Sequence, residues 1–447
     1  MTTPIPSDTT GQATSATGAT GQADTTTGQA TSATSATGPA APEAQVLVLN
    51  CGSSSVKYRL LAPSTGHVAA TGLVERIGSP AARLEHRVPA ADGTTARHEH
   101  EGPFDDHTAA LAGVLAAFAE HGPDLDRAPL AAVGHRVVHG GTRFDGAVLI
   151  DDELVAAVDE LSVMAPLHNP ANLVGIRTAL AAFGNVPHVA VFDTAFHHTL
   201  PDRACTYPVP ELWREKYGVR RYGFHGSSYA AVTREAAALL GRDPDRTNLI
   251  IAHLGNGASA CAVEAGRSID TTMGLTPVGG LMMGTRSGDV DPALSAHLAR
   301  VAGLDAVHVE RSLNAESGLL AVAGASDLRE VEQRAEAGDS KALLALDVYC
   351  YRIRCCVGAY YAALGRVDAI VFTGGVGENS ARVRHDSITG LDRLGILLDE
   401  EANQDRSRHT ARSIACPDSP VQILVVPTDE DREIARQALT ALRTARL

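Results

Sequence analysis

The stretch VLVLNCGSSSVKYRLL, residues 46–61, decides how we interpret this sequence. A continuously apolar, strand-like run is followed by a turn of glycine and serine, and then by a second strand-like run. Lys57 follows that turn, although only three of the 447 residues are lysine. Backbone N–H groups, hydroxyls and one ammonium at a turn would suit a phosphate group. The turn lacks the spacing GxxxxGK[ST], so it is no P-loop, and a plain β-turn explains it equally well.

Two more glycine-rich turns follow strand-like runs, at HLGNGAS (residues 253–259) and TGGVGENS (residues 373–380). The turn TGGVGENS precedes a helical pattern, and a helix N-terminus favours negative charge. Neither turn matches GxGxxG, so a dinucleotide-binding fold is unsupported. One such loop is weak evidence, but three of them at strand ends favour a nucleoside triphosphate as the ligand.

Strand-like and helical patterns alternate from residue 45 to the end of the chain, which predicts an α/β fold. Open sheets of this kind bind ligands at the carboxyl ends of their strands. The strand–turn–strand units at Asn50 and Gly255 lie about 200 residues apart. This spacing indicates a duplicated fold of two domains.

Composition excludes several classes of function. A net charge of −14 argues against nucleic acid as a partner, and the longest uncharged apolar runs of about ten residues are too short to span a membrane. The seven cysteines form no CxxC pair, which predicts reduced thiols and a cytoplasmic location. Residues 1–44 are of low complexity and lack the pattern of a signal or transit peptide, so we predict a disordered tail.

Two arginines lie among glycines, Arg136 in GHRVVHGG and Arg286 in MMGTRSGDVDP. Guanidinium groups stabilise the charge on the oxygens of a phosphoryl group in transfer. The alternative is a pair of surface salt bridges. Two carboxylates, Asp193 and Glu430, each follow an apolar strand-like run and could orient a nucleophile or hold Mg²⁺. The alternatives are a helix N-cap for Asp193 and a first-turn helix acid for Glu430.

The 18 histidines contain no HExxH pattern or other tight spacing of metal ligands. His168 and His225 lie in turns rich in proline or aromatic residues. Most histidines are therefore interpreted as structural imidazoles, and one or two as donors to a phosphate.

Taken together, these motifs resemble the acetate kinase family, within the superfamily of acetate and sugar kinases, heat-shock chaperones and actin. The resemblance runs from about residue 46 to the last helical pattern. It rests on the following segments, in the family's order: NCGSSSVK, GHRVVHGG, APLHNP, VFDTAFH, RRYGFHGSS, HLGNGAS, DTTMGLTPVGGLMMGTRSGDVDP, TGGVGEN and VVPTDED.

The resemblance implies an actin-like ATPase fold of two domains with a cleft between them. We expect one domain over residues 45–195 with a returning helix at 429–447, and a nucleotide-binding and dimerisation domain over residues 196–428. It also implies ATP and ADP as nucleotides, Mg²⁺ (with Mn²⁺ as an alternative), and a homodimer.

The resemblance further implies roles for the matching residues. The expected catalytic residues are Arg136, Asp193, His225 and Arg286, with His168 as a further active-site histidine. The expected acyl-substrate residues are Arg136, Val138, Leu167, Phe224 and Pro277. The expected nucleotide residues are Ser53, Ser55, Lys57, His253, Asn256, Gly257, Asp327, Arg329, Gly375 and Asn379. The expected metal ligands are Asn50 and Glu430.

The sequence departs from the family at a few positions. Gly279 stands where glutamate is common, Cys51 stands where a smaller residue is usual, and Asp429 and Asp431 change the acidic turn. None removes an expected catalytic group, but Gly279 is two residues from Pro277 and bears on the size of the acyl pocket.

A carboxylate is already ionised near pH 7, so it attacks without a general base. The expected reaction is direct in-line transfer between ATP and acetate, giving acetyl phosphate and ADP, reversibly. Propionate or butyrate kinase is the first alternative, since one methylene changes discrimination by only about 1–3 kcal/mol. A non-enzymatic actin-like ATP-binding switch is the second, and a zinc hydrolase the third.

Overall fold

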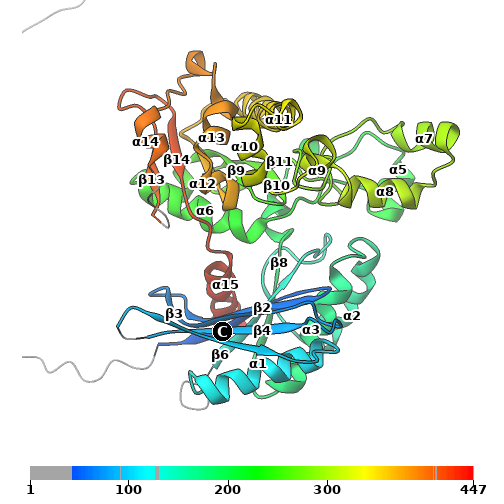
Figure 1. The fold of residues 1–447 in the computed structure, drawn as a ribbon, viewed down its shortest axis with the longest axis vertical. Helices are drawn as coiled ribbons and strands as arrows, with labels where there is room; N and C mark the ends of the chain where they lie inside the picture. Colours follow the sequence, from blue (N-terminus) through cyan, green and yellow to red (C-terminus); the bar gives the residue numbers. More distant parts are fainter. Residues whose placement is uncertain (1–42, 91, 126–129, 406, 408–409, 446–447) are drawn as a thin grey trace, which may run out of the picture. The chain divides into compact units, whose positions relative to one another are not determined.

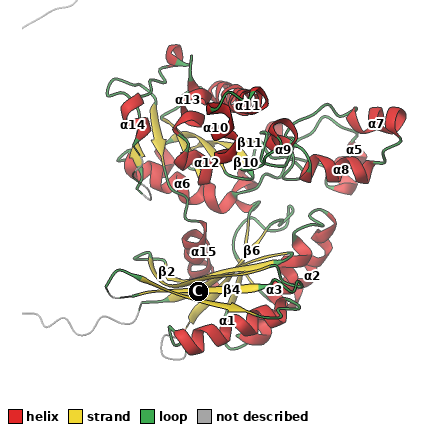
Figure 2. Cartoon of the chain, viewed as in Figure 1, coloured by secondary structure: helices red, strands yellow, loops and turns green. Residues whose placement is uncertain are grey.

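The computed structural model describes residues 43–447, apart from residues 91, 126–129, 406, 408–409 and 446–447 (Figures 1 and 2). The prediction of a disordered tail therefore falls outside the described residues, except at 43–44. Strands and helices alternate along the chain, which confirms the predicted α/β class. In the described residues, no helix is both long enough and apolar enough to cross a membrane.

The first sheet has eight strands in the order β5-β4-β3-β2-β1-β6-β8-β7. Parallel pairing joins β1 to β6 and β6 to β8, while β1, β2 and β3 pair antiparallel. The strands are β1 (Gln45–Gly52), β2 (Ser55–Ala62), β3 (His67–Glu75), β4 (Arg83–Pro89), β5 (Thr95–Glu101), β6 (Leu130–Val137), β7 (Val148–Leu149) and β8 (His188–Phe192).

The second sheet has six strands in the order β11-β10-β9-β12-β14-β13. Its run β11-β10-β9-β12-β14 repeats the run β3-β2-β1-β6-β8 of the first sheet, with antiparallel and parallel pairs in the same places. The prediction of a duplicated fold is thereby confirmed at the level of strand order. The strands are β9 (Asn248–Leu254), β10 (Ala258–Glu264), β11 (Arg267–Thr271), β12 (Ala369–Thr373), β13 (Arg412–Ser413) and β14 (Gln422–Val425).

Helices fill the connections between strands (Figure 2). Those before β9 are α1 (His107–His121), α2 (Asp152–Glu160), α3 (Asn169–Ala182), α4 (Asp202–Cys205), α5 (Glu211–Tyr217) and α6 (Gly226–Leu239). Those after β11 are α7 (Leu294–Ala302), α8 (Ala306–Ala315), α9 (Gly318–Ala323), α10 (Leu328–Glu336), α11 (Ser340–Leu364), α12 (Gly374–Asn379), α13 (Ala381–Ile388), α14 (Glu400–Gln404) and α15 (Glu430–Ala445). The 3₁₀ segments are η1 (Leu161–Val163), η2 (Ala195–Thr199), η3 (Pro244–Arg246) and η4 (Asp392–Leu394).

The central strands β1, β6 and β8 of the first sheet are largely buried on both faces, whereas the edge strand β5 is mostly exposed. Leu47 and Leu49 of β1 pack on the side of α1 and α3, while Val46 and Val48 pack on the side of α15. This period of two follows from the strand pleat. Helix α15 follows a strand of the second sheet but packs against the first, which is where a returning C-terminal helix was expected. Residues 43–447 form one compact unit, so the domain boundaries near 195 and 429 stay a prediction.

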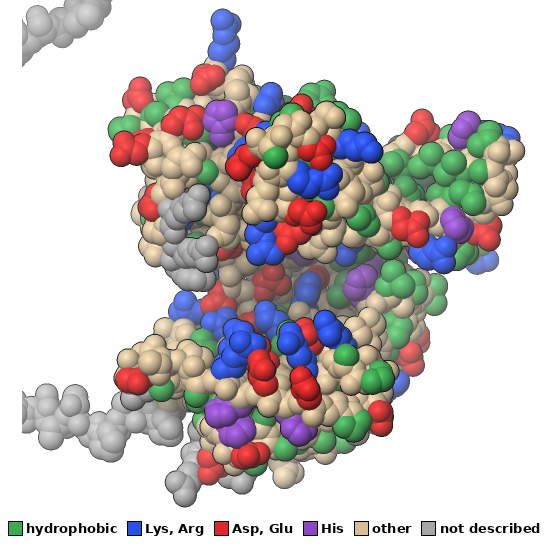
Figure 3. All heavy atoms as spheres, viewed as in Figure 1, with side chains coloured by type: hydrophobic (Ala, Val, Ile, Leu, Met, Phe, Trp, Pro, Cys, Tyr) green, Lys and Arg blue, Asp and Glu red, His purple; other side chains and the backbone are tan. Residues whose placement is uncertain are grey.

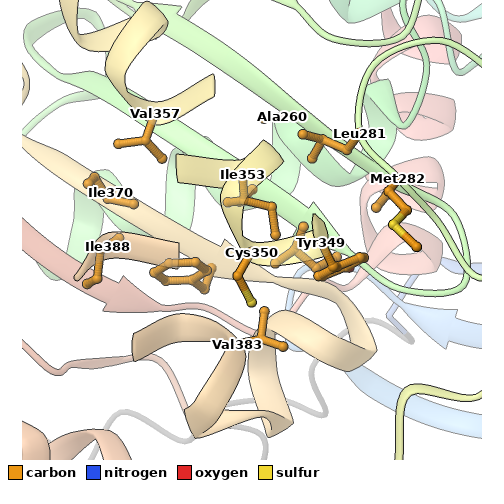
Figure 4. Close-up of a cluster of buried hydrophobic side chains, with 14 of the residues drawn as sticks. Ala260, Leu281, Met282, Tyr349, Cys350, Ile353, Val357, Ile370, Val383 and Ile388 are labelled. Atoms are coloured by element: carbon orange, nitrogen blue, oxygen red, sulfur yellow. The ribbon is translucent and has the colours of Figure 1, made fainter. Parts of the chain in front are cut away.

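The second sheet is buried in the same way. Ile250 of β9 packs toward α11, and its neighbour Ile251 packs toward α6 on the opposite face. Figure 4 shows Cys350 and Ile353 of α11 in one cluster with Ile370 of β12. The long apolar helix α11 therefore supports the strands whose ends carry the second and third glycine-rich turns.

Candidate active site

The Gly-Ser turn after Asn50 is a tight hairpin between β1 and β2. Gly52 pairs with Ser55, which leaves residues 53–54 as the turn, and Asn50 pairs directly with Lys57. Directly opposite residues of an antiparallel pair present their side chains on the same face. Lys57 Nζ lies 3.7 Å from Asp431 Oδ2, so this face of the hairpin adjoins the start of α15.

Glu430 is the first residue of α15, so the alternative interpretation as a first-turn helix acid is confirmed for its position. The structure gives its carboxylate no hydrogen bond or ion pair with any described residue. Burial raises the pKa of Glu430, and the charge of Arg136 opposes that rise. A carboxylate of this kind lacks a counter-charge at close range.

The side-chain oxygens of Glu430 and Asn50 are suitable ligands for a magnesium ion. Mg²⁺ binds through one or two protein oxygens and completes its octahedron with water and phosphate oxygens. The Glu430 carboxylate and the Asn50 amide are of the right type. Among the described residues, no group of three or more His, Cys, Asp or Glu side chains could hold a metal ion, and this does not support the zinc alternative.

Arg136 and Asp193 come from neighbouring parallel strands, at the end of β6 and just after β8. Arg136 Nε lies 3.0 Å from Asp193 Oδ1, and Nη2 lies 2.6 Å from Oδ2. Such paired hydrogen bonds fix the plane of a guanidinium group. The N-cap of η2 is Thr194, so the helix N-cap alternative for Asp193 was wrong.

The start of α6 lies directly against this ion pair. The Gly226 N–H donates to the Asp193 carbonyl oxygen at 2.9 Å, and a Cβ on Gly226 would lie 2.3 Å from that oxygen. Only glycine fits there. The preceding residue, His225, has φ = +60°, a left-handed conformation that is uncommon outside glycine and is found at functional sites.

Arg286 and His225 converge on the second glycine-rich turn. A Cβ on Gly257 would lie 3.5 Å from Arg286 Nη1 and 3.6 Å from His225 Nε2. The Arg286 guanidinium also donates to the carbonyl oxygen of Pro277 at 3.2 Å. The backbone of the turn and the Arg286 and His225 side chains therefore lie at one place.

The positive charges of Arg136 and Arg286 influence the pKa of the same two histidines. Burial is the main cause that lowers the pKa of His225 and of His168, and the charges of Arg136 and Arg286 lower each pKa further. The two guanidinium groups, one from each sheet's side of the molecule, therefore share neighbours. Figure 3 shows a hollow in the surface where Lys or Arg, Asp or Glu, and His side chains lie together.

The rings of His225 and His253 are stacked, with centroids 4.2 Å apart and planes inclined by 25°. Burial lowers the pKa of His253 to about 4, so the ring is neutral near pH 7. Its Nδ1 lies 2.8 Å from Ser228 Oγ, which in turn lies 2.8 Å from Thr428 Oγ1.

Five of the expected nucleotide residues line one cavity of about 660 Å³ between β9, α10 and α12. These residues are Asn256, Asp327, Arg329, Gly375 and Asn379. The expected residues that lie outside this lining are Ser53, Ser55, Lys57, His253 and Gly257. Sequence reasoning missed other lining residues, namely Gly255, Leu319, Ser326, Leu328, Glu332, Tyr349, Val376 and Ser380.

Besides Arg136, the four remaining expected acyl-substrate residues differ in their surroundings. Phe224 is 2% exposed, and its ring lies 5.7 Å from that of His139. Pro277 contacts Arg286, and the Val138 N–H donates to Asn172 Oδ1 at 3.1 Å. Leu167 is 65% exposed, so the described structure does not bring it into a packed pocket.

The sequence departures are accommodated. A Cβ on Gly175 of α3 would lie 2.3 Å from Cys51 Sγ, so the larger side chain of Cys51 occupies space that Gly175 leaves open. A Cβ on Gly279 would lie 3.5 Å from Asp289 Oδ1, an ordinary contact.

Sequence reasoning also missed the polar residues behind the histidines. Ser259 Oγ lies 2.9 Å from His225 Nδ1, and buried His197 bonds to the Phe224 carbonyl oxygen at 2.9 Å. The available signal was a serine within the otherwise apolar strand run ASACAV, where a buried hydroxyl needs a partner.

Comparison with known proteins identifies a family that the chain matches. A family model described as the Acetokinase family matches residues 45–436. An acetate kinase of Streptomyces avermitilis is 52% identical over 401 residues, covering 90% of this chain and 98% of that protein. An acetate kinase of Clavibacter michiganensis is 53% identical over 396 residues, covering 89% of this chain and 98% of the other.

Solved structures agree with the sequences. The crystal structure of Porphyromonas gingivalis acetate kinase has a TM-score of 0.83 and 44% identity, covering 89% of this chain and 100% of that one. A propionate kinase from Francisella tularensis has a TM-score of 0.82 and 38% identity, covering 89% and 99%. With the family model, the relatives and the fold in agreement, the chain belongs to the acetokinase family.

Proposed function

We propose that this protein is an acetate kinase, which transfers the terminal phosphoryl group of ATP to acetate, reversibly. The observation that carries the proposal is that Arg286 and His225 converge on the Gly257 turn, where the charge of Arg136 also acts on His225. Two guanidinium groups at one place suit a reaction between two anions. Relatives that are acetate kinases, about 50% identical over nearly nine-tenths of this chain, support the same assignment.

The chemistry requires little of the protein beyond alignment and charge neutralisation. A carboxylate oxygen of acetate attacks the terminal phosphorus, a new C–O–P linkage forms, and the bond from phosphorus to the bridging oxygen of ADP breaks. ADP leaves with the electron pair, and no proton is transferred at pH 7 because acetate is already ionised. The transition state spreads charge over three equatorial oxygens, which donors must stabilise.

The described residues can be given roles in that transfer. Arg136, held in plane by Asp193, would bind the carboxylate and the moving phosphoryl group, and Arg286 would bind the phosphoryl group from the Gly257 side. His225 would donate from Nε2. Mg²⁺, held by Asn50 and Glu430, would supply positive charge to the phosphates. The backbone of the Gly257 turn would line the phosphate path.

The cavity lined by Asp327, Arg329, Gly375 and Asn379 is the proposed site of the adenosine part of ATP or ADP. Its volume, about 660 Å³, falls within the range of small-molecule sites. Asn256 lies in this cavity lining, and its neighbour Gly257 lies beside Arg286 and His225. A nucleotide that followed this turn would bring its phosphates to the arginines.

The test is an assay for acetyl phosphate as its hydroxamate, with ATP, Mg²⁺ and acetate. ATP binding without product would support a non-enzymatic switch instead. Propionate is the second candidate substrate, because a propionate kinase is 38% identical over 89% of this chain. The ratio of kcat/KM for acetate and propionate decides between them, and a clear preference for propionate would overturn the choice of acetate.

We also propose a homodimer and a cytoplasmic location. The part of the chain around α5, α7 and α8 carries exposed apolar side chains, a composition typical of interfaces (Figure 3). These residues are Leu212, Trp213, Tyr217, Val290, Val301 and Val307. All seven cysteines are free thiols, which supports a reducing compartment. Sedimentation of the full chain tests the dimer, and a monomer at micromolar concentration would contradict it.

A further inference from the structure

The imidazole of His225 is supported from behind by two buried hydroxyl groups. Ser259 Oγ of β10 lies 2.9 Å from His225 Nδ1, and Tyr229 Oη of α6 bonds to the same Ser259 oxygen. Ser259 and Tyr229 are both 0% exposed. The three side chains form one chain of hydrogen bonds that leads from the core to the site.

The number of hydrogens on each group determines which group donates in each of these hydrogen bonds. Tyr229 Oη has one hydrogen to donate, and Ser259 is the only described residue to which the structure bonds it. A buried donor without an acceptor is costly, so Tyr229 donates to Ser259. Ser259 then has its own hydrogen left, and its remaining partner is His225 Nδ1. Nδ1 is therefore the acceptor and carries no proton.

A neutral imidazole has one N–H, so the proton of His225 lies on Nε2. The ring stays neutral near pH 7, because burial and the neighbouring His253, Arg136 and Arg286 all lower its pKa. Nε2 is the nitrogen that faces the Gly257 turn, close to Arg286. The N–H group thus points to the place where the phosphoryl group would lie.

We propose that Ser259 and Tyr229 are positioning residues that fix His225 in its Nε2–H tautomer, ready to donate to a phosphoryl oxygen. The purpose assigned to the tautomer rests on the proposed function, whereas the tautomer itself follows from the described hydrogen bonds alone. The opposite tautomer would present a lone pair to an anionic substrate, next to donors that all favour negative charge.

The hydrogen bonds of the stacked neighbour, His253, do not fix its tautomer in the same way. Its Nδ1 bonds to Ser228, and Ser228 bonds to Thr428, which is partly exposed. In either direction that chain ends at Thr428, which solvent can reach, so neither direction leaves a buried hydroxyl donor unpaired. At Tyr229 the chain ends in the core, and that end sets the direction.

The first experiment reads the tautomer directly. Full-length protein labelled with ¹⁵N-histidine, without nucleotide or acetate, is studied by long-range ¹H–¹⁵N correlation, with His225→Gln to assign the ring. We expect a protonated Nε2 and an unprotonated Nδ1 in the unmodified protein. Tyr229→Phe and Ser259→Ala should each admit the Nδ1–H form. A protonated Nδ1 in the unmodified protein, or no change in either variant, would overturn the proposal.

The second experiment connects the tautomer to turnover. Tyr229→Phe and Ser259→Ala should lower kcat about tenfold or more, because one transition-state donor is worth about 10²–10³-fold and these changes weaken it only in part. The KM values for ATP and acetate should change less than about threefold. Ser259→Thr, which keeps the hydroxyl, should restore both the tautomer and kcat.

Matched controls separate this role from packing. Ser227→Ala removes a buried serine hydroxyl of the same helix that has no partner among the described residues, and Tyr360→Phe removes a buried phenol on α11. Both should keep kcat and the His225 tautomer. A tautomer shift with unchanged kcat would overturn the link to transfer. A tautomer shift in a protein that makes no acetyl phosphate would uphold the hydrogen-bond chain and contradict the proposed function.

Discussion

The Arg136 guanidinium donates hydrogen bonds from Nε and Nη2 to the Asp193 carboxylate, which is almost fully buried. Arg136 keeps 22% of its side chain exposed. One edge of the guanidinium group is therefore fixed by the protein, and the remaining N–H groups stay available to a ligand. Asp193 thus acts on substrate through Arg136.

Asp193→Asn should lower kcat by about 10–100-fold, because an amide cannot hold both guanidinium nitrogens in one plane. Stability should fall by less than the roughly 3–5 kcal/mol seen when fully buried ion pairs are broken, since Arg136 is partly hydrated. Steady-state kinetics and urea unfolding measure the two effects. Asp159→Asn breaks an exposed pair with Arg177 and should change neither. Unchanged kcat in folded Asp193→Asn protein would refute the role of Asp193.

Arg286→Ala should reduce kcat by about 10²–10³-fold, the usual effect of one lost transition-state donor. Its described hydrogen bonds go to the Pro277 carbonyl oxygen and a methionine sulfur, so the melting temperature should change little. Arg286→Lys should recover only part of the activity, because an ammonium lacks the planar fork. Arg393→Ala, at an exposed site, is the control. Near-normal turnover by Arg286→Ala would exclude Arg286 from the reaction.

Much of the fold and part of the site could be predicted from the sequence. Strands β1, β9 and β12 end in glycine-rich turns, and local patterns of apolar residues and glycine mark such places. The likeness of the segments to one family supplied the expected site residues. Five of the ten expected nucleotide residues line one cavity, and their role in binding a nucleotide stays a prediction.

The rest depends on contacts between distant residues. Ser259 is 34 residues from His225, and Ser228 is 200 residues from Thr428. No local pattern pairs such hydroxyls, because packing of a helix on a strand brings them together. The positive φ of His225 is another tertiary effect, since left-handed histidines are uncommon and nothing in the sequence YGFHG requires one here.

Phe224→Leu should shift preference from acetate toward propionate by about tenfold in the ratio of kcat/KM, because the smaller side chain enlarges the proposed acyl pocket. Leucine is preferable to alanine here, since Phe224 is 2% exposed and Phe→Ala in a core costs about 3–5 kcal/mol. Phe118→Leu, at a phenylalanine that is also 2% exposed in the first sheet's core, controls for lost packing. An unchanged ratio would place the acyl pocket elsewhere.

Stability should fall steeply when the pH drops below about 6.5. Burial lowers the pKa of His139, His197 and His253 to about 4, and that of His135 to about 3. Between about pH 4 and 6.5 the unfolded chain binds more protons than the folded one, so unfolding becomes easier as pH falls. Each histidine contributes at most about 1.4 kcal/mol per pH unit.

Urea unfolding at pH 7, 6 and 5 measures this dependence. The free energy of unfolding should drop by several kcal/mol between pH 6.5 and 5. The carboxylates contribute a smaller share of this drop than the histidines at these pH values. His197→Gln should reduce the slope by up to one histidine's contribution, whatever its effect at pH 7. A flat profile between pH 7 and 5 would mean that these rings are protonated in the folded protein.

Gly175→Ala should destabilise the protein by about 1–3 kcal/mol or more, as overpacking does. This sign is opposite to the usual effect, since Gly→Ala within a helix stabilises by up to about 1 kcal/mol. The new Cβ would lie 2.3 Å from Cys51 Sγ and 2.6 Å from its Cβ. Helix α3 cannot move away freely, because Asn172 Nδ2 of the same helix donates to the Cys51 carbonyl oxygen at 2.8 Å.

A double-mutant cycle with Cys51→Ala isolates this contact. Removing the sulfur relieves the 2.3 Å clash but leaves the two Cβ atoms too close, so the double variant should lie between Gly175→Ala and the unmodified protein. The coupling energy should be about 1 kcal/mol or more in the compensating direction. Gly358→Ala in α11, where a Cβ would meet nothing within 4 Å, should instead stabilise. Additive effects of Gly175→Ala and Cys51→Ala would show that α3 and β1 are not in contact there, and that another residue sets the spacing behind the Asn50 turn.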